Sequence, residues 1–512
     1  MQFRQRLDAI NTLRMSNASA QAATNPTISH KQSHRPDVKI VRSGQLSSRW
    51  LQLMLSQRWP RYLIGFALFV CLPSLWAGFM SDDHYIRARF LAPGIMPLFN
   101  DFSFFGLFSI AEGTQRNLDQ LVQHGLLPWF TEPDFHFKLS RPLAELSHAF
   151  DFLLWPNTPL LMHIHHLLWL CAFYFSALLL YRKLFSENRL LFSIALAWVV
   201  LDSNMSQTII WLAARNTLMA ATFSVLSLYF YVAADQEQKK SYLALSVVSY
   251  ALGLFSSEFA LGGAGYFLAY CIWMQSGGYK RFLALLPFGL VGSLWAAAYL
   301  MGKQGVAGSG FYIDPISDTS GYLLTLVSRY PAYIFHQLFF IPFPTFTFIE
   351  NFNIYWWLEL TTVALFFWVV RRAFRFNQFK FLMAGALFAL LPISASPGGP
   401  RIMLLAGIGF APIIAYLIQQ WISLDASHRL RKLGFTVLGF HALSFLFWML
   451  LFTYEMTIID VRYVQQAARN LPVSDDDATK QWIVLNSPAT FWTNQFPLIR
   501  AVEGKSNPAA WY

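Results

Sequence analysis

Long apolar runs constrain this chain more than any other feature, because each is about as long as a membrane is thick. A helix that crosses a bilayer needs about 20 mainly apolar residues. The sequence therefore predicts an all-α, polytopic membrane protein with about 11 transmembrane helices, several of them short. The runs lie at 61–80, 159–181, 190–207, 212–233, 242–256, 259–275, 282–301, 355–371, 380–394, 402–421 and 434–455.

The composition favours the same class of protein. Charged residues make up 13% of the 512 residues and hydrophobic residues make up 55%, whereas about a quarter of a soluble domain is charged. The formal net charge of +11 would point to nucleic acid in a soluble protein. Here the basic residues cluster in short segments between apolar runs, where they act as topology signals. We therefore expect a lipid bilayer as a partner, and no nucleic acid.

The basic segments also predict an orientation. Beyond the basic tail before residue 61, they lie at 182–189, 279–281, 371–380 and 427–432. Basic loops stay on the cytoplasmic side of a membrane. Alternating passes through eleven spans then place the N-terminus in the cytoplasm and the C-terminus outside. Compact loops fit a bacterial inner membrane, with a periplasmic outer face.

These passes divide the chain into three predicted regions. Residues 1–60 are expected to form a disordered, basic, cytoplasmic tail, 61–455 the transmembrane domain, and 456–512 a small periplasmic segment. Within the transmembrane domain, residues 81–158 form a large first outer loop of amphipathic pieces, which we expect to be interfacial helices.

Two further segments test this scheme. Residues 321–349 are apolar, but counting them as a span would move the basic segment 371–380 outside. Prolines such as Pro331 favour a broken, re-entrant or interfacial helix there instead.

In the last region, 456–470 should be helical and 481–488 should form a strand that ends in a turn, so we expect a small α/β unit.

Two adjacent acids, Asp82 and Asp83, directly follow the first apolar run. Mutual repulsion and partial desolvation at a membrane boundary both raise a carboxylate pKa. One of the two could therefore act as a general base near neutral pH. A polar stop after the span, or a helix cap, would explain the pair equally simply.

Three arginines, Arg141, Arg215 and Arg401, lie at the predicted outer ends of apolar helices. Arginines at such positions need anionic partners, and arginine binds phosphate through two parallel hydrogen bonds. Together they predict an anionic ligand on the outer face, such as a lipid phosphate. Ion pairs with nearby acids such as Asp151, or contacts with bulk lipid phosphates, are the structural alternative.

Histidines and one more acid complete the set of candidates. His163 and His166 are three residues apart, so one helix face can present both. Metal binding, hydrogen bonds to a polar ligand or to the acid pair, and plain packing are all open for them. Glu258 lies at an outer helix end and should pair with an arginine or a polar ligand. No third ligand accompanies the acid pair, so we expect no metal and no cofactor.

In their order along the chain, these features resemble the GT-C superfamily of polytopic glycosyltransferases, most closely protein O-mannosyltransferase-like members (glycosyltransferase family 39-like), including the TMTC type. The likeness covers roughly residues 61–420 and departs from the family at His166, where asparagine is usual, and at Ser257, where lysine is usual. The matching segments are the acid pair Asp82–Asp83, "RPLAELSHAFDFLLWP", "PLLMHIHH", "ARNTLMA", "SSEFA" and "PRIMLL".

The resemblance implies a GT-C fold and transfer of a sugar, with inversion, from a polyprenyl-phosphate donor to an acceptor hydroxyl on the outer face. The acceptor could be a protein, a lipopolysaccharide or another cell-envelope glycan. Of the two acids, the resemblance favours Asp82 as the base, while Asp83 would orient His84 or an arginine or contact the sugar. The arginines would bind the donor phosphate. The remaining candidates, His84, His163, His166 and Glu258, would contact substrate.

Other functions remain open from the sequence. An anionic-solute transporter or lipid flippase usually places its charges near mid-membrane and often in repeats, whereas here they gather at the outer ends. An O-antigen polymerase or ligase also uses outer-face arginines, usually in a large later loop. A non-catalytic membrane scaffold is also compatible with long apolar runs.

Overall fold

The computed structural model describes most of the chain from residue 49 onward. The described ranges are 49–92, 106–309, 312–339, 354–396, 399–474, 477, 479–484 and 490–511. These residues are mainly helical, as predicted. Eight helical segments are long and apolar enough to cross a membrane, namely Trp59–Trp76, Pro159–Leu184, Arg189–Ile210, Leu212–Glu237, Gly278–Met301, Asn377–Ser394, Leu404–Ile422 and Arg429–Asn470.

Each of the eleven predicted spans coincides with helix. Eight correspond to the long segments above, and three are shorter. The shorter ones are α11 (Lys240–Ser256), η6 (Glu258–Gly262) with α12 (Gly263–Trp273), and α15 (Ile354–Val370). The other main helices are α3 (Trp59–Cys71), α7 (Pro159–Leu184), α8 (Arg189–Val200), α10 (Arg215–Glu237), α13 (Leu286–Met301), α16 (Asn377–Ser394), α17 (Leu404–Ile422) and α18 (Arg429–Met456).

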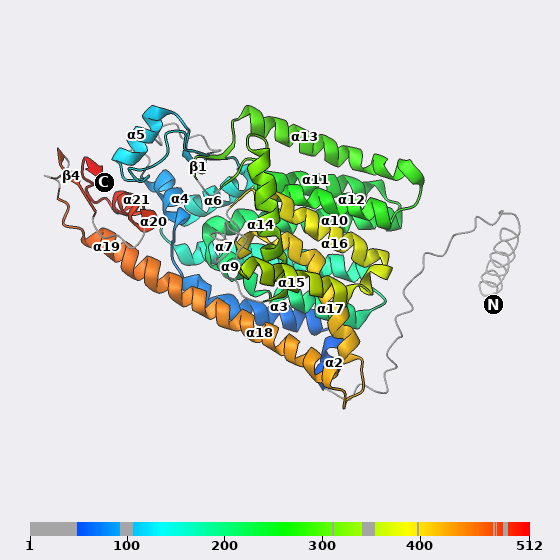
Figure 1. The fold of residues 1–512 in the computed structure, drawn as a ribbon. Coiled ribbons are helices and arrows are strands. Elements are labelled where there is room, and N and C mark those ends of the chain that lie inside the picture. The colour runs from blue at the N-terminus through cyan, green and yellow to red at the C-terminus, as the bar shows by residue number, and fades with distance from the viewer. Residues whose placement is uncertain are drawn as a thin grey trace, which may run out of the picture. The chain divides into compact units, whose positions relative to one another are not determined.

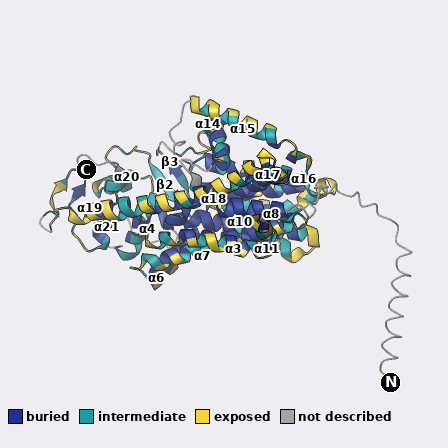
Figure 2. Ribbon diagram, turned by 90° about the horizontal axis from the view of Figure 1, so that it is seen from below, coloured by how far each residue is buried: buried dark blue, intermediate teal, exposed yellow. Residues whose placement is uncertain are grey.

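The core of the bundle is formed by α7, α8, α10, α12, α16 and α17, whose facing side chains belong to one apolar cluster (Figures 1 and 2). Close crossings hold it together. A Cβ on Gly409 of α17 would lie 2.2 Å from the carbonyl oxygen of Leu382 on α16. Only glycine permits this approach, as is common where helices pack within membranes.

Outer helices keep apolar side chains exposed. On α13, Leu286, Leu290 and Leu294 repeat every four residues and are 64%, 62% and 62% exposed. Residues four apart lie on one helix face, so α13 presents a continuous apolar stripe away from the bundle. A stripe of this length is the surface that a bilayer would cover.

One end of the bundle carries the first loop (Figure 1). Its elements are α4 (Asp82–Leu91), β1 (Phe108–Ala111), α5 (Gln115–Gln123), β2 (His136–Leu139) and α6 (Pro142–Leu154). β3 (Gly305–Ala307), which follows α13, completes an antiparallel sheet of order β1-β2-β3. Phe108 pairs with Leu139, and Phe137 pairs with Val306. The expectation of interfacial helices alone missed this sheet.

Short 3-10 turns and one short helix join the main helices. They are η2 (Leu72–Trp76), η4 (Ser203–Met205), α9 (Ser206–Ile210), η5 (Leu212–Ala214), η7 (Gly278–Leu285), η9 (Ala373–Arg375) and η10 (Pro400–Ile402). α14 (Thr319–Leu338) covers the first part of the predicted broken helix and runs unbroken through Pro331. The remainder of that segment, 340–349, lies outside the described residues.

The C-terminal segment begins inside a helix. α18 continues as a π-helix, η11 (Thr457–Val464), and as α19 (Gln465–Asn470), which confirms helix at 456–470. Of the predicted strand 481–488, the described part forms β4 (Gln481–Trp482), paired in parallel with β5 (Ala510–Trp511). Two helices between them, α20 (Thr490–Thr493) and α21 (Phe496–Val502), were not predicted.

The predicted disordered tail is wrong at its C-terminal end, where α2 (Arg49–Leu55) forms. Leu51 and Met54 of α2 are buried in the main apolar cluster. Arg189 caps the helix by donating to the carbonyl oxygens of Leu55 and Ser56 at 2.6 and 2.7 Å. Packing and capping therefore order these residues, while residues 1–48 lie outside the described ranges.

Candidate functional site

A cleft that is open to solvent lies where α4, the three-stranded sheet, α10 and η10 meet, and is called the cavity below. Its wall is mostly apolar and aromatic, with a few polar groups among them, as is usual in ligand sites. The charged residues in the wall are Asp82, Arg141 and Arg401, and the polar or aromatic ones include Tyr85, Phe108, Phe137, Trp211, Asn216, Thr217, Phe259, Tyr312 and Ser396.

The three charged residues come from distant parts of the sequence. Asp82 begins α4, Arg141 directly precedes α6, and Arg401 lies in η10 before α17. Two of the three predicted arginines thus lie around one cavity with the first acid of the pair. Arg215 does not line it.

Asp82 is half-buried in the wall of the cavity. Burial raises the pKa of its carboxyl, and the positive charge of Arg401 is the largest opposing influence, followed by a hydrogen bond from Ser81 and the charge of Arg141. The Ser81 hydroxyl is 3.4 Å from Asp82 Oδ1. A carboxylate with a raised pKa at a cavity wall has the properties of a general base.

Asp83 is in a different environment, with only 2% of its surface exposed. Its Oδ1 accepts the backbone N–H of Ala213 at 2.7 Å, and its Oδ2 accepts that of Met80 at 3.1 Å. Burial raises the pKa of this carboxyl too, although the two backbone N–H groups oppose the rise. Asp83 therefore links α4 to η5 by a hydrogen bond, and both of its carboxylate oxygens are occupied by backbone N–H groups.

Arg401 carries a positive charge that the described residues leave without an ion pair. Its guanidinium lies over the Trp211 ring, 4.5 Å from the ring centre, a stabilising cation–π contact. Its backbone carbonyl accepts the Thr208 hydroxyl at 3.1 Å, which anchors η10 against α9. The charge stays available to a ligand in the cavity.

Arg141, by contrast, is held by Glu258. Its Nε and Nη2 donate to the two carboxylate oxygens of Glu258 at 3.0 and 2.5 Å, so the acid pairs with an arginine, one of the two partners expected for it. The guanidinium also lies 5.0 Å from the centre of the Phe108 ring. Arg141 lines the cavity with its charge already partly neutralised.

Arg215 lies fully buried behind the cavity. Its Nη1 is 2.5 Å from Oδ2 of Asp151, and its Nη2 donates to the carbonyl oxygen of Met162 at 3.1 Å. The other oxygen of Asp151 is bonded to His165 Nδ1 at 2.6 Å. The sequence left two roles open for Arg215, an ion pair with an acid such as Asp151 or binding of a phosphate. The geometry favours the ion pair.

The candidate histidines also lie away from the cavity. His163 and His166 are buried, and their Nε2 atoms bond to the carbonyl oxygens of Gly78 and Thr208 at 2.9 and 2.8 Å. His84 is 2% exposed, with Nε2 3.9 Å from Oδ1 of Asp460. Over the described ranges, no group of three or more histidine, cysteine or acidic side chains is placed to hold a metal ion.

Several wall residues were not predicted. Asn216 and Thr217 directly follow Arg215 on α10, where successive residues point about 100° apart. The motif predicted from the sequence therefore does reach the cavity, but through Asn216 and Thr217 rather than through Arg215. Trp211 lies just before the same motif. Tyr312, in the loop after β3, had no signal in the sequence.

No family model matches this sequence, and no curated protein is similar to it at a significant level. What the site can do is therefore inferred from the residues of the cavity and from the sequence motifs that supply them. A carboxylate with a raised pKa faces the same space as an arginine that has no ion pair among the described residues. Such a site can bind an anion and accept a proton from a neutral group beside it.

Proposed function

We propose that this protein is an inverting membrane glycosyltransferase of the GT-C type. It moves a sugar from a polyprenyl phosphate to an acceptor hydroxyl in the cavity lined by Asp82 and Arg401. The single observation that carries the proposal is the convergence of Asp82, Arg141 and Arg401 on one cavity, at one end of a bundle of apolar helices. The order of the sequence motifs supports the same activity.

The reaction uses the two charges for different steps. Asp82 accepts the proton of the acceptor hydroxyl, and that oxygen forms a bond to the anomeric carbon of the sugar. The bond between that carbon and the phosphate oxygen breaks on the opposite face, which inverts the configuration. Polyprenyl phosphate leaves with an additional negative charge, which Arg401 and Arg141 stabilise. No cofactor is needed, since the phosphate leaves as a stable anion.

Asp82 is the better candidate for the base than Asp83. A general base must reach the proton that it removes, and Asp82 lines the cavity. Both oxygens of Asp83 accept backbone N–H groups. In this mechanism Asp83 positions α4, and its carboxylate does not contact the acceptor.

The topology belongs to the same proposal. With eleven spans and the basic segments in the cytoplasm, the cavity faces the periplasm of a bacterial inner membrane, and the C-terminal segment lies on that side too. A cysteine introduced at Lys505, which is exposed, should then react with a membrane-impermeant reagent in intact cells. Protection of this cysteine would contradict the orientation.

Transfer from a panel of polyprenyl-phosphate sugars, measured in membranes, tests the activity. General base catalysis contributes about 10²–10⁴-fold, so Asp82→Asn should lower kcat by about a thousandfold. Asp119→Asn is a matched control, because Asp119 is an exposed acid on α5 outside the cavity. Full transfer by the Asp82→Asn variant would contradict the proposal.

The same arginines would also suit an anionic-solute transporter or lipid flippase, and this is the second candidate. Such a protein needs the positive charge of Arg401 and has no use for a general base. Uptake or flipping that depends on Arg401 and persists in Asp82→Asn would favour it over the transferase. An O-antigen polymerase or ligase would be distinguished by a donor that carries a preassembled glycan rather than a single sugar.

A further inference from the structure

The turn that presents Asp82 has an unfavourable backbone conformation. Ser81, the residue before α4, has φ of 50° and ψ of −124°. A residue other than glycine rarely has a positive φ, because this conformation is sterically unfavourable. It persists only when surrounding contacts hold the backbone in place. Such residues gather at functional sites, and this one directly precedes the proposed base.

The contacts that hold this turn come from the far end of the chain. The Ser81 N–H donates to Oδ2 of Asp460 at 2.9 Å, and Gln465 Nε2 donates to the carbonyl oxygen of Phe79 at 3.0 Å. Val461 packs against Gly78 so closely that a Cβ on that glycine would lie 2.9 Å from Val461 Cγ2.

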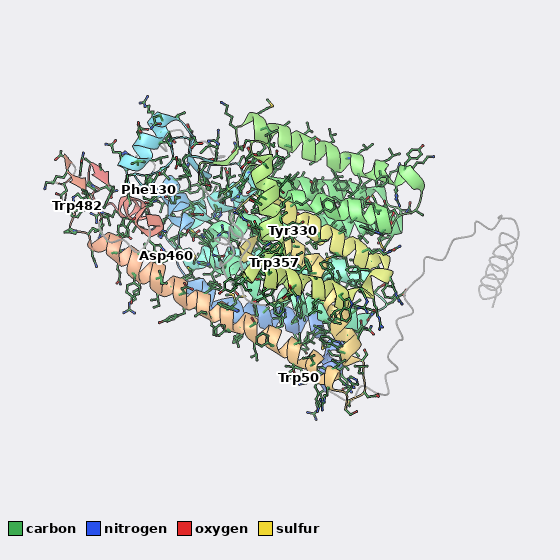
Figure 3. All side chains as sticks on the ribbon, in the orientation of Figure 1. Trp50, Phe130, Tyr330, Trp357, Asp460 and Trp482 are labelled. Atoms are coloured by element: carbon green, nitrogen blue, oxygen red, sulfur yellow. The ribbon has the colours of Figure 1, made fainter. Side chains whose placement is uncertain are left out.

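Asp460 and Val461 lie on the π-helix η11, in the C-terminal third of the continuous helix that runs from α18 to α19. Figure 3 shows Asp460 on this helix. π-Helical turns are rare in proteins, and those that occur are often found at functional sites. The carboxylate of Asp460 is buried, and its second oxygen lies 3.9 Å from His84 Nε2. One oxygen thus fixes the turn, and the other faces the residue that follows the acid pair.

We propose that Asp460 is a positioning residue for Asp82. By accepting the Ser81 N–H, it fixes the strained turn and so aims the Asp82 carboxylate into the cavity. The proposal rests on the proposed function, since it assumes that Asp82 is the base. Asp460 itself does not line the cavity, so it acts through the backbone of Ser81 and does not touch the substrates.

Two substitutions at one position separate the hydrogen bond from the charge. Asp460→Ala removes the acceptor of the Ser81 N–H, whereas Asp460→Asn keeps a carbonyl oxygen in its place. Since a misplacement of about 1 Å can cost about 10²-fold in rate, Asp460→Ala should lower kcat by roughly 10- to 100-fold. The donor KM should stay within about threefold, because uniform binding is untouched. Asp460→Asn should retain most of kcat.

Controls cover folding and local packing. Glu455→Ala removes another carboxylate from the same continuous helix, five positions before Asp460, and should behave as wild type. Should Asp460→Ala fail to fold in detergent, Gln465→Ala leaves Asp460 in place. It removes the bond to the Phe79 carbonyl oxygen and the bond that Arg469 donates to Gln465 Oε1 at 3.3 Å, and it should lower kcat in the same direction by less. Unchanged kcat in a folded Asp460→Ala would overturn the proposal, and so would unchanged kcat in Gln465→Ala where Asp460→Ala does not fold. Equal loss in Asp460→Ala and Asp460→Asn would overturn it too, since the charge would then matter rather than the hydrogen bond.

Asp82→Asn assayed in parallel separates the two proposals. If Asp82→Asn is inactive while Asp460→Ala has wild-type kcat, the positioning role is wrong and the proposed function stands. If Asp82→Asn keeps full activity, the proposed function falls, and the positioning role falls with it.

Discussion

Two aspartate–arginine combinations lie near each other in this protein, and they are built differently. Asp151 and Arg215 are fully buried, in direct contact at 2.5 Å, and satisfied further by His165 and by a backbone carbonyl group. Asp82 and Arg401 face a cavity, and among the described residues Arg401 makes no ion pair. The first arrangement is closed to any ligand, whereas the second leaves both charges available.

The difference separates a structural ion pair from two charges that are available to a ligand. A buried pair is worth little over apolar packing, but removing one partner leaves an uncompensated charge and is strongly destabilising. Charges kept apart at a cavity wall contribute little to folding and are ready to stabilise charge that develops on a ligand. Breaking the first arrangement should therefore affect stability, and breaking the second should affect turnover.

The largest effect, on stability, is expected at the buried Asp151–Arg215 ion pair. Arg215→Ala leaves the Asp151 carboxylate buried without its guanidinium, which should destabilise the fold by about 3–5 kcal/mol. A lower midpoint of thermal unfolding in detergent measures this. Replacing the pair together, as Arg215→Met with Asp151→Leu, should restore most of the stability. A wild-type midpoint in Arg215→Ala would show that the two regions do not differ in this way.

At Asp82 and Arg401, the effect should appear in the pH dependence of the transfer rate. In the proposed mechanism, transfer requires ionised Asp82, whose pKa is raised by burial and held down most strongly by Arg401. The rate should therefore rise with pH through an acidic limb, and Arg401→Ala should move that limb to higher pH while lowering kcat by about a hundredfold. Arg401→Lys keeps the charge and should leave the limb near its wild-type position. An unmoved limb in Arg401→Ala would show that Arg401 does not act on Asp82.

The smallest effect is expected at Arg141, whose charge is shared with Glu258. Glu258→Gln keeps much of the hydrogen bonding and removes the competing negative charge, so Arg141 can turn toward the donor phosphate. The donor KM should fall by about threefold, within the range for ion pairs that are not fully buried. Glu237→Gln, in the Lys183 pair, is the matched control. A higher KM would instead show that Glu258 holds Arg141 in its binding position.

The helices and the chemical types at the site could be predicted from the sequence, because apolar runs and charged residues at their ends are local signals. Which arginine reaches the cavity could not. α10 is buried around most of its circumference, so the sequence contains no polar face that would show which side of the helix faces the cavity. A rotation of the helix by one residue decides whether Arg215 or Asn216 lines it. The convergence of Asp82 and Arg401, which are hundreds of residues apart, is a tertiary property.

The sheet and the C-terminal contacts were hidden for another reason. β1, β2 and β3 have four, four and three residues, too few for an alternating pattern to be recognised. β3 also joins from a different loop, which no local pattern encodes. Likewise, helix was expected at 456–470, but nothing in that segment indicated that Asp460 would accept a hydrogen bond from Ser81.

The continuous helix from Arg429 to Asn470 has 42 residues. At about 1.5 Å per residue it is about 63 Å long, roughly twice the thickness of the hydrocarbon core. A single crossing therefore uses only part of this helix, and its C-terminal third carries Asp460, which accepts the N–H of Ser81 in the turn before Asp82. Each residue inserted before Asp460 would raise that residue by about 1.5 Å and rotate it by about 100°. A single insertion would thus separate Asp460 from the Ser81 N–H without changing any side chain of the cavity.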